Sequence, residues 1–149
     1  MTKRIAAALI AALAAGALPA FAQETAITAP AGDLVFQLNK AETNGGSCTL
    51  TFVLQNNTGA VIEKSVYNMA IVNTDGVVAT LINIEFKSLP LGRPKVQGFG
   101  IPNLPCEDIS ALSINEFTEC TTDAGAASTV CEDMIAQSSR TSIQFPWAL

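Results

Sequence analysis

Apolar and polar residues alternate with a period of two along the chain from residue 33 onward. In residues 33–39 the apolar side chains of Leu34, Phe36 and Leu38 fall on one face of an extended segment, and residues 48–56 repeat the pattern. Turn clusters rich in Gly, Asn and Thr follow both segments. This alternation predicts two strands that each bury one face.

Four further β-rich segments follow, at residues 61–73, 77–86, 95–101 and 108–117. The Asp-Gly pair at positions 75 and 76 signals a tight hairpin, because Gly readily takes the positive φ that such a turn needs. The segment at 77–86 has β-branched residues on both faces. Gly98 and Gly100, in the segment at 95–101, indicate a bulge or the edge of a sheet.

Six or seven short strands with little helix predict a mainly β protein, an antiparallel Ig-like β-sandwich. An up-and-down barrel is the alternative. Antibody-type domains carry a Trp between two mid-strand cysteines, whereas Trp147 lies near the C-terminus, so the likeness is one of architecture. Residues 128–139 could form about three helical turns capped by Ser128, although β-branched Thr129 and Val130 disfavour the first turn. We therefore expect a short C-terminal segment that is helical or irregular.

The first 22 residues have the order of a secretory signal: a basic start, an Ala- and Leu-rich run and the small-residue site A-F-A. The apolar run is shorter than the ~20 residues that a membrane-spanning helix needs, and no later segment is long enough. The sequence predicts a cleaved signal at residues 1–22, a flexible leader at 23–32 and a single domain at 33–149. We expect a bacterial periplasmic or secreted protein with no membrane span after cleavage.

The charge balance excludes several classes of function. Cleavage after residue 22 removes two of the eight basic residues and no acidic ones, which changes the formal charge from −5 to −7. Such an acidic chain repels nucleic acids and anionic lipid surfaces. The chain has no histidine, which excludes Ser-His-Asp and Cys-His nucleophiles, histidine zinc sites and imidazole pH switches.

Four cysteines lie in the predicted exported part, and four cysteines allow three pairings. If six strands alternate in direction, Cys48 and Cys106 lie at the same end, and Cys120 lies at the opposite end, near Cys131 in sequence. This favours the disulfides Cys48–Cys106 and Cys120–Cys131, whereas a seventh strand inserted between residues 61 and 93 would favour Cys48–Cys120. With no C-x-x-C motif and no zinc-ribbon spacing, we expect structural disulfides.

Carboxylates gather in the C-terminal third of the chain. The acidic side chains after Cys106 are Glu107, Asp108, Glu116, Glu119, Asp123, Glu132 and Asp133. All but Glu116 are candidate Ca²⁺ ligands, because carboxylates suit this ion and a disulfide could gather them. No D-x-D-x-D-G loop is present, and a solvated acidic surface explains the same residues. No spacing selects a hydrolase pair, so the sequence predicts no catalytic residue, no cofactor and no definite metal site.

Three other features have both a functional and a structural reading. Arg93 and Arg140 could bind an anionic partner, or pair with carboxylates of the same domain. Asn56-Asn57-Thr58 matches the N-glycosylation sequon, although the signal is of bacterial type and the motif often arises by chance.

Several segments together resemble a family of small exported bacterial proteins of unassigned function. These segments are GGSCTLTFVLQNNTGAVIEK, VNTDGVVATL, FKSLPLGRPKVQGFGI, CEDISALSINEFTEC and SSRTSIQF. The resemblance covers most of the predicted mature chain, including its four cysteines. It implies a single disulfide-bonded, Ig-like periplasmic domain and brings no catalytic or ligand residue.

We expect an exported, non-enzymatic β-sandwich that binds a protein or an envelope component. The candidate surfaces are the edge at residues 93–101 and the loops at 56–60 and 103–108, because sandwiches commonly bind through edges and end loops. The alternative function is Ca²⁺-dependent or small-molecule binding by the acidic region from Cys106 to Asp133.

Overall fold

The computed structural model describes residues 34–123, 125, 129–131 and 135–146. The predicted signal segment and leader, together with Glu132, Asp133 and Trp147, lie outside the described residues.

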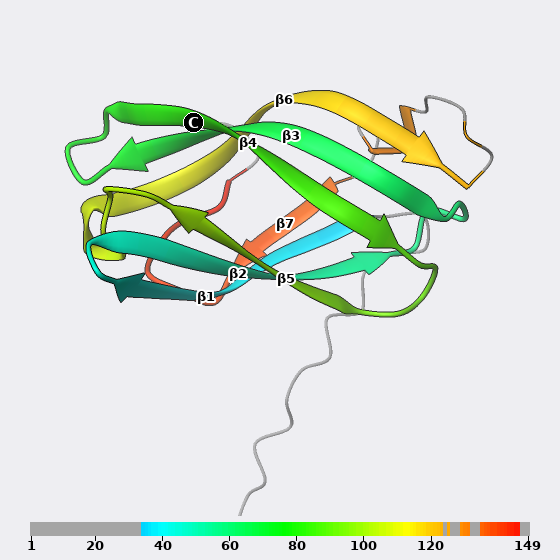
Figure 1. The fold of residues 1–149 in the computed structure, drawn as a ribbon, viewed down its shortest axis with the longest axis horizontal. Helices are drawn as coiled ribbons and strands as arrows, with labels where there is room; N and C mark the ends of the chain where they lie inside the picture. Colours follow the sequence, from blue (N-terminus) through cyan, green and yellow to red (C-terminus); the bar gives the residue numbers. More distant parts are fainter. Residues whose placement is uncertain (1–33, 124, 126–128, 132–134, 147–149) are drawn as a thin grey trace, which may run out of the picture.

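Two β-sheets pack face to face (Figure 1). The four-stranded sheet has the order β5-β2-β1-β7, and the three-stranded sheet has the order β4-β3-β6. The strands are β1 (Leu34–Asn44), β2 (Ser47–Asn56), β3 (Ile62–Asn73), β4 (Val78–Leu89), β5 (Lys95–Ile101), β6 (Ile109–Thr122) and β7 (Ile135–Ser139). All neighbours pair antiparallel except β7, which is parallel to β1. The prediction of a mainly β, Ig-like sandwich is confirmed, and the two sheets do not close into a barrel.

Aromatic side chains from both sheets fill the centre of the sandwich. Phe36 of β1 stacks on Phe86 of β4 with ring centroids 4.9 Å apart, and meets Tyr67 of β3 edge to face at 5.2 Å. Phe52 of β2 also contacts Phe86, at 5.6 Å. All four side chains are fully buried. Because each strand contributes alternate residues to this layer, the period-two pattern of the sequence is the direct cause of the two-layer fold.

Tight turns set the register of both main hairpins. Gly45 and Gly46 join β1 to β2 with φ of 58° and 78°, values that a residue without Cβ adopts at little cost. Between β3 and β4, Gly76 has φ of 78°, and the Asn73 side chain accepts hydrogen bonds from the amides of Asp75 and Val77. The hairpin predicted at positions 75 and 76 is therefore present.

The disulfides are Cys48–Cys106 and Cys120–Cys131, the pairs that the strand-direction argument favours. The seventh strand lies after Cys131 and not between residues 61 and 93, so the directions of the first six strands are as assumed. Cys120 lies within β6, which runs to Thr122, and not after the strand as the sequence suggested. The two bonds suggest an oxidising, extracytoplasmic environment.

The described residues between 129 and 139 do not form the three helical turns that the sequence allowed. Thr129–Cys131 forms a single 3₁₀ turn, and Ile135–Ser139 forms β7. The β-branched residues Thr129 and Val130 disfavour a helix, and the open side of β1 offers hydrogen-bonding groups along Leu34–Leu38. Pairing with β1 therefore outweighs the local helical pattern. Within the described residues, no helix has the length and apolar character needed to cross a membrane.

Candidate functional site

The described carboxylates that were candidate Ca²⁺ ligands lie in two separate groups. Glu107 and Asp108 form a 3₁₀ turn just before β6, whereas Glu119 and Asp123 lie near its other end. The strand has 14 residues, so its ends are about 43 Å apart at ~3.3 Å per residue. Among the described residues, no group of three or more His, Cys, Asp or Glu side chains could hold a metal ion. The length of β6 thus keeps these four carboxylates from forming one site.

Glu107 has a structural partner. The hydroxyl of Thr43, at the end of β1, donates a hydrogen bond of 2.6 Å to the Glu107 carboxylate. This bond holds the pKa of Glu107 below its usual range, because it favours the ionised form. Thr43 Oγ1 also accepts a hydrogen bond from the Cys106 amide at 2.9 Å, so the hydroxyl fastens the 3₁₀ turn to the β1–β2 hairpin.

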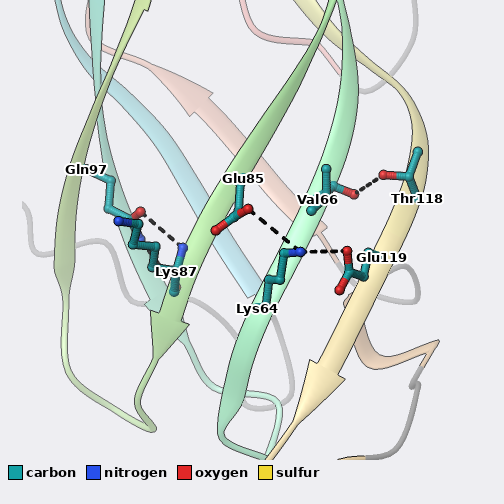
Figure 2. A network of polar contacts seen from close by, with 7 residues as sticks. All are labelled: Lys64, Val66, Glu85, Lys87, Gln97, Thr118 and Glu119. Carbon is teal, nitrogen blue, oxygen red and sulfur yellow. Dashed lines mark hydrogen bonds and ion pairs between the residues drawn. The ribbon is translucent and has the colours of Figure 1, made fainter.

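Glu119 belongs to an ion-pair network on the outer face of the three-stranded sheet (Figure 2). Lys64 of β3 lies between Glu119 of β6, at 2.8 Å, and Glu85 of β4, at 3.7 Å. The hydrogen bond with Glu119 is the largest cause of a raised Lys64 pKa. These groups are exposed and connect the three strands, so their arrangement is that of a surface network and not of a reactive centre.

An open pocket of about 500 Å³ lies between β1, the 3₁₀ turn at Cys106–Asp108 and the segment after β7. Its described lining includes Lys40, Thr43, Glu107 and Arg140. Lys40 pairs with Glu42 at 2.7 Å, and the Arg140 amide donates to the carbonyl of Leu38 at 2.8 Å. Glu107 is the single carboxylate among the described lining residues, so these residues do not include a pair of carboxylates.

The loop at residues 56–60 holds the two sheets together. Asn56 is buried, and its side-chain amide donates to the carbonyls of Ala60, at 2.8 Å, and Leu89, at 2.7 Å. Both amide hydrogens are therefore used inside the fold. The sequon at Asn56 has a structural role and does not present an accessible glycosylation site.

The exposed large apolar side chains lie in a part of the chain that only partly overlaps the predicted edge at 93–101. The large hydrophobic residues that are exposed in the described part of the chain all fall between residues 77 and 96. They are Val77, Val78, Leu81, Leu91 and Val96, with exposures of 43–64%. We call these five residues the apolar patch. The patch includes part of the predicted edge at 93–101, but most of it lies on β4 and the loop that follows.

One feature of the sequence concerned this part of the chain. The segment at 77–86 has β-branched residues on both faces, a pattern that fits a strand buried on both sides as well as an exposed one. The structure shows that β4 is an edge strand whose first half is exposed. Deciding between the two needs the neighbouring strands, which the sequence does not supply.

The second half of β4 is covered by β5 (Figure 2). The Lys87 amide donates to Gln97 Oε1 at 3.2 Å, and the Lys87 carbonyl accepts from Gln97 Nε2 at 3.4 Å. Lys95 Nζ donates to the carbonyl of Ser88. Side chains of β5 therefore pair with the outward N–H and C=O of Lys87, and a further one reaches the carbonyl of Ser88.

No protein-family model matches the chain, and no curated protein matches it. The solved structure of IrmA from Escherichia coli has a similar fold, with a TM-score of 0.53 and 11% sequence identity. The match covers 70% of this chain and 90% of the IrmA chain. At this identity the likeness shows the fold alone. It is consistent with the resemblance to small β-sandwich proteins and assigns no family.

Proposed function

We propose that this protein is an exported, non-enzymatic module that binds a protein partner through the apolar patch on β4, β5 and the adjoining loops. The observation that carries the proposal is that the exposed large apolar residues of the described chain lie along the neighbouring edge strands β4 and β5, in their connecting loop and in the turn before β4, with Leu81 and Val96 on the outer faces of the two different sheets. A single exposed apolar residue needs no explanation, but several of them along two neighbouring sheet edges of an acidic domain favour an interaction site at those edges.

Two further observations support this function. The pocket beside Thr43 has an open, polar lining in which Glu107 is the one described carboxylate. The disulfides suit a domain that works outside the cytoplasm, which agrees with the predicted signal at residues 1–22. We therefore propose a periplasmic or secreted location, which the disulfides and the predicted signal both support.

Photocrosslinking in the producing cell tests the proposal. A photoreactive amino acid is placed at Leu81 or at Val96, and at Glu116 as a control that is exposed on β6, at the opposite edge of the same sheet as β4. We expect discrete protein adducts from the two patch positions, identified by mass spectrometry, and none from Glu116. Equal labelling at all three positions, or no adduct from the patch, would overturn the proposed function.

A further inference from the structure

Part of the outer edge of β4 has backbone N–H and C=O groups that are not paired with another strand among the described residues. Their one described contact is a long one, from the hydroxyl of Thr80. Lys87 directs both its N–H and its C=O away from β3, since both bond to Gln97. Alternate residues of an antiparallel strand face the same side, and the β3–β4 register is continuous from Thr80 to Lys87. Leu81, Asn83 and Glu85 therefore present outward amides and carbonyls. We call these three residues the open edge; Thr80 Oγ1 lies 3.5 Å from the Leu81 carbonyl.

The other three sheet edges are poor templates for an added strand. β5 contains Gly98 and Gly100 and follows Pro94, β7 has five residues, and β6 has four register shifts against β3. Glycines, short strands and bulges all weaken edge pairing. The open edge of β4 is regular, and the register shift in β4 lies before it, next to Val78.

We propose that the open edge binds a second copy of this chain, with the two β4 strands antiparallel across a two-fold axis at Asn83. This inference rests on the proposed function, because it names the occupant of part of the apolar patch. With the axis at Asn83, each outward residue meets another outward residue: Asn83 faces Asn83, and Leu81 faces Glu85. All the free backbone groups of the open edge are then paired, and the three-stranded sheets become one six-stranded sheet.

The charge distribution along β4 favours this antiparallel arrangement. Asp75 lies in the turn before the strand, and Lys87, Arg93 and Lys95 follow its open edge. These three cations are a large share of the eight Lys and Arg residues in the chain. A two-fold axis through the strand brings the acidic end of each copy to the basic end of the other. Glu85 lies between the two ends, and its charge is partly offset by Lys64. Parallel docking would instead bring like charges together.

The apolar side chains also complement themselves in this register. On the inner face, Ile82 of one copy lies beside Ile84 of the other, which extends the core across the axis. On the outer face, Leu81 lies over the aliphatic part of Glu85. Both Leu81, at 54% exposure, and Ile82, which is half-buried, lose contact with water. Burial of these side chains adds apolar stabilisation to the hydrogen bonds of the paired strands.

Cysteine crosslinking of the mature, disulfide-bonded protein tests the register. Facing residues in a hydrogen-bonded pair have Cα atoms about 5.5 Å apart, a distance that a disulfide spans. Asn83→Cys should therefore form a covalent dimer under mild oxidation. Leu81→Cys and Glu85→Cys are the matched controls, because each is about 14 Å from its own copy. Neither control alone should crosslink, whereas a mixture of the two should give a mixed dimer. Crosslinking by Leu81→Cys alone and not by Asn83→Cys would overturn this register.

Measurement of the molar mass by light scattering tests the dimer itself. Asn83→Pro removes an outward N–H that β3 does not use, so the sandwich should fold as a monomer, and circular dichroism checks that it does. Asn83→Ala keeps the N–H and should remain a dimer. A wild-type protein that is monomeric at every concentration tested would overturn the inference.

The photocrosslinking experiment separates this inference from the proposed function. An adduct of Leu81 with twice the mass of the chain supports the second copy. An adduct with a different protein, from a wild-type chain that is monomeric, would overturn the second copy and leave the proposed function in place. The absence of any adduct at the patch would overturn both.

Discussion

Replacement of Asn56 by alanine should strongly destabilise the fold, although the residue lies at the end of β2 and begins a sequon, a motif usually found on exposed loops. The side-chain amide donates to the buried carbonyl of Leu89 and to the partly buried carbonyl of Ala60. Its oxygen accepts from both the amide and the hydroxyl of Thr58. Asn56→Ala removes this donor from the Leu89 carbonyl and leaves the Ala60 carbonyl with a long contact of 3.4 Å from the Thr58 hydroxyl.

The magnitude follows from these groups. A buried carbonyl left without a partner costs ~1–3 kcal/mol, and the more accessible one costs less because water reaches it. We expect a loss of about 2–4 kcal/mol in the free energy of unfolding, a large part of the ~5–15 kcal/mol of a typical domain. Asn56→Asp should cost more, because carboxylate oxygens would face the two carbonyls without a hydrogen to donate.

The measurement is urea unfolding of the mature, oxidised protein, followed by far-ultraviolet circular dichroism. Asn57→Ala is the matched control, since the Asn57 side chain accepts one hydrogen bond, of 3.2 Å from Gln55. This control should change the stability by less than about 0.5 kcal/mol. If Asn56→Ala has as small an effect as the control, the assigned role of the Asn56 amide is wrong.

Three further results are expected. Tyr67 is the single tyrosine, and burial raises the pKa of its phenol well above the ordinary value of ~10, so absorbance at 295 nm should not report titration near that pH until the protein unfolds. The neutral phenol is favoured by folding, so this stabilisation is complete below the unfolded pKa and is lost as the pH rises above it. Thr43→Val should raise the pKa of Glu107 toward its usual range in an NMR titration, because the hydrogen bond that lowers it is lost. Since the pKa of Glu107 is lower in the folded than in the unfolded protein, this bond stabilises the fold at pH values above the ordinary Glu pKa, and the stabilisation is lost as the pH falls through the folded pKa. Joint replacement of Cys48 and Cys106 by serine should lower the unfolding free energy by about 4 kcal/mol, as the chain-entropy relation gives for their separation of 58, and an unchanged urea midpoint would contradict it.

Most strands could be predicted because their signal is local. Period-two alternation is written in consecutive residues, and it placed β2, β3 and β5 within a residue or two of their observed bounds. The disulfide pairs followed from the direction of successive strands, which short hairpins constrain. The strand β7 could not be predicted in this way, because its conformation comes from pairing with β1, about a hundred residues earlier in the chain.

The candidate site was less predictable than the fold. Glu107 and Glu119 are close in sequence, yet an extended strand carries them to opposite ends of the domain. Asn56 looked like a loop residue in a sequon, whereas its environment is set by Leu89 on another strand. The residues of the apolar patch were divided among the predicted strand at 77–86, a loop and a predicted edge.

The sequence by itself determined that the chain forms short strands with one buried face and that histidine chemistry is absent, and it favoured the observed cysteine pairs over the alternative Cys48–Cys120. These properties depend on residue identity and on neighbours along the chain. Only the tertiary structure decided which strands lie at the edges, which carboxylates stay apart and where backbone groups of β4 remain open. Exposure and hydrogen bonding depend on what lies beside a residue in space, and in a β-sandwich most of those neighbours are distant in sequence.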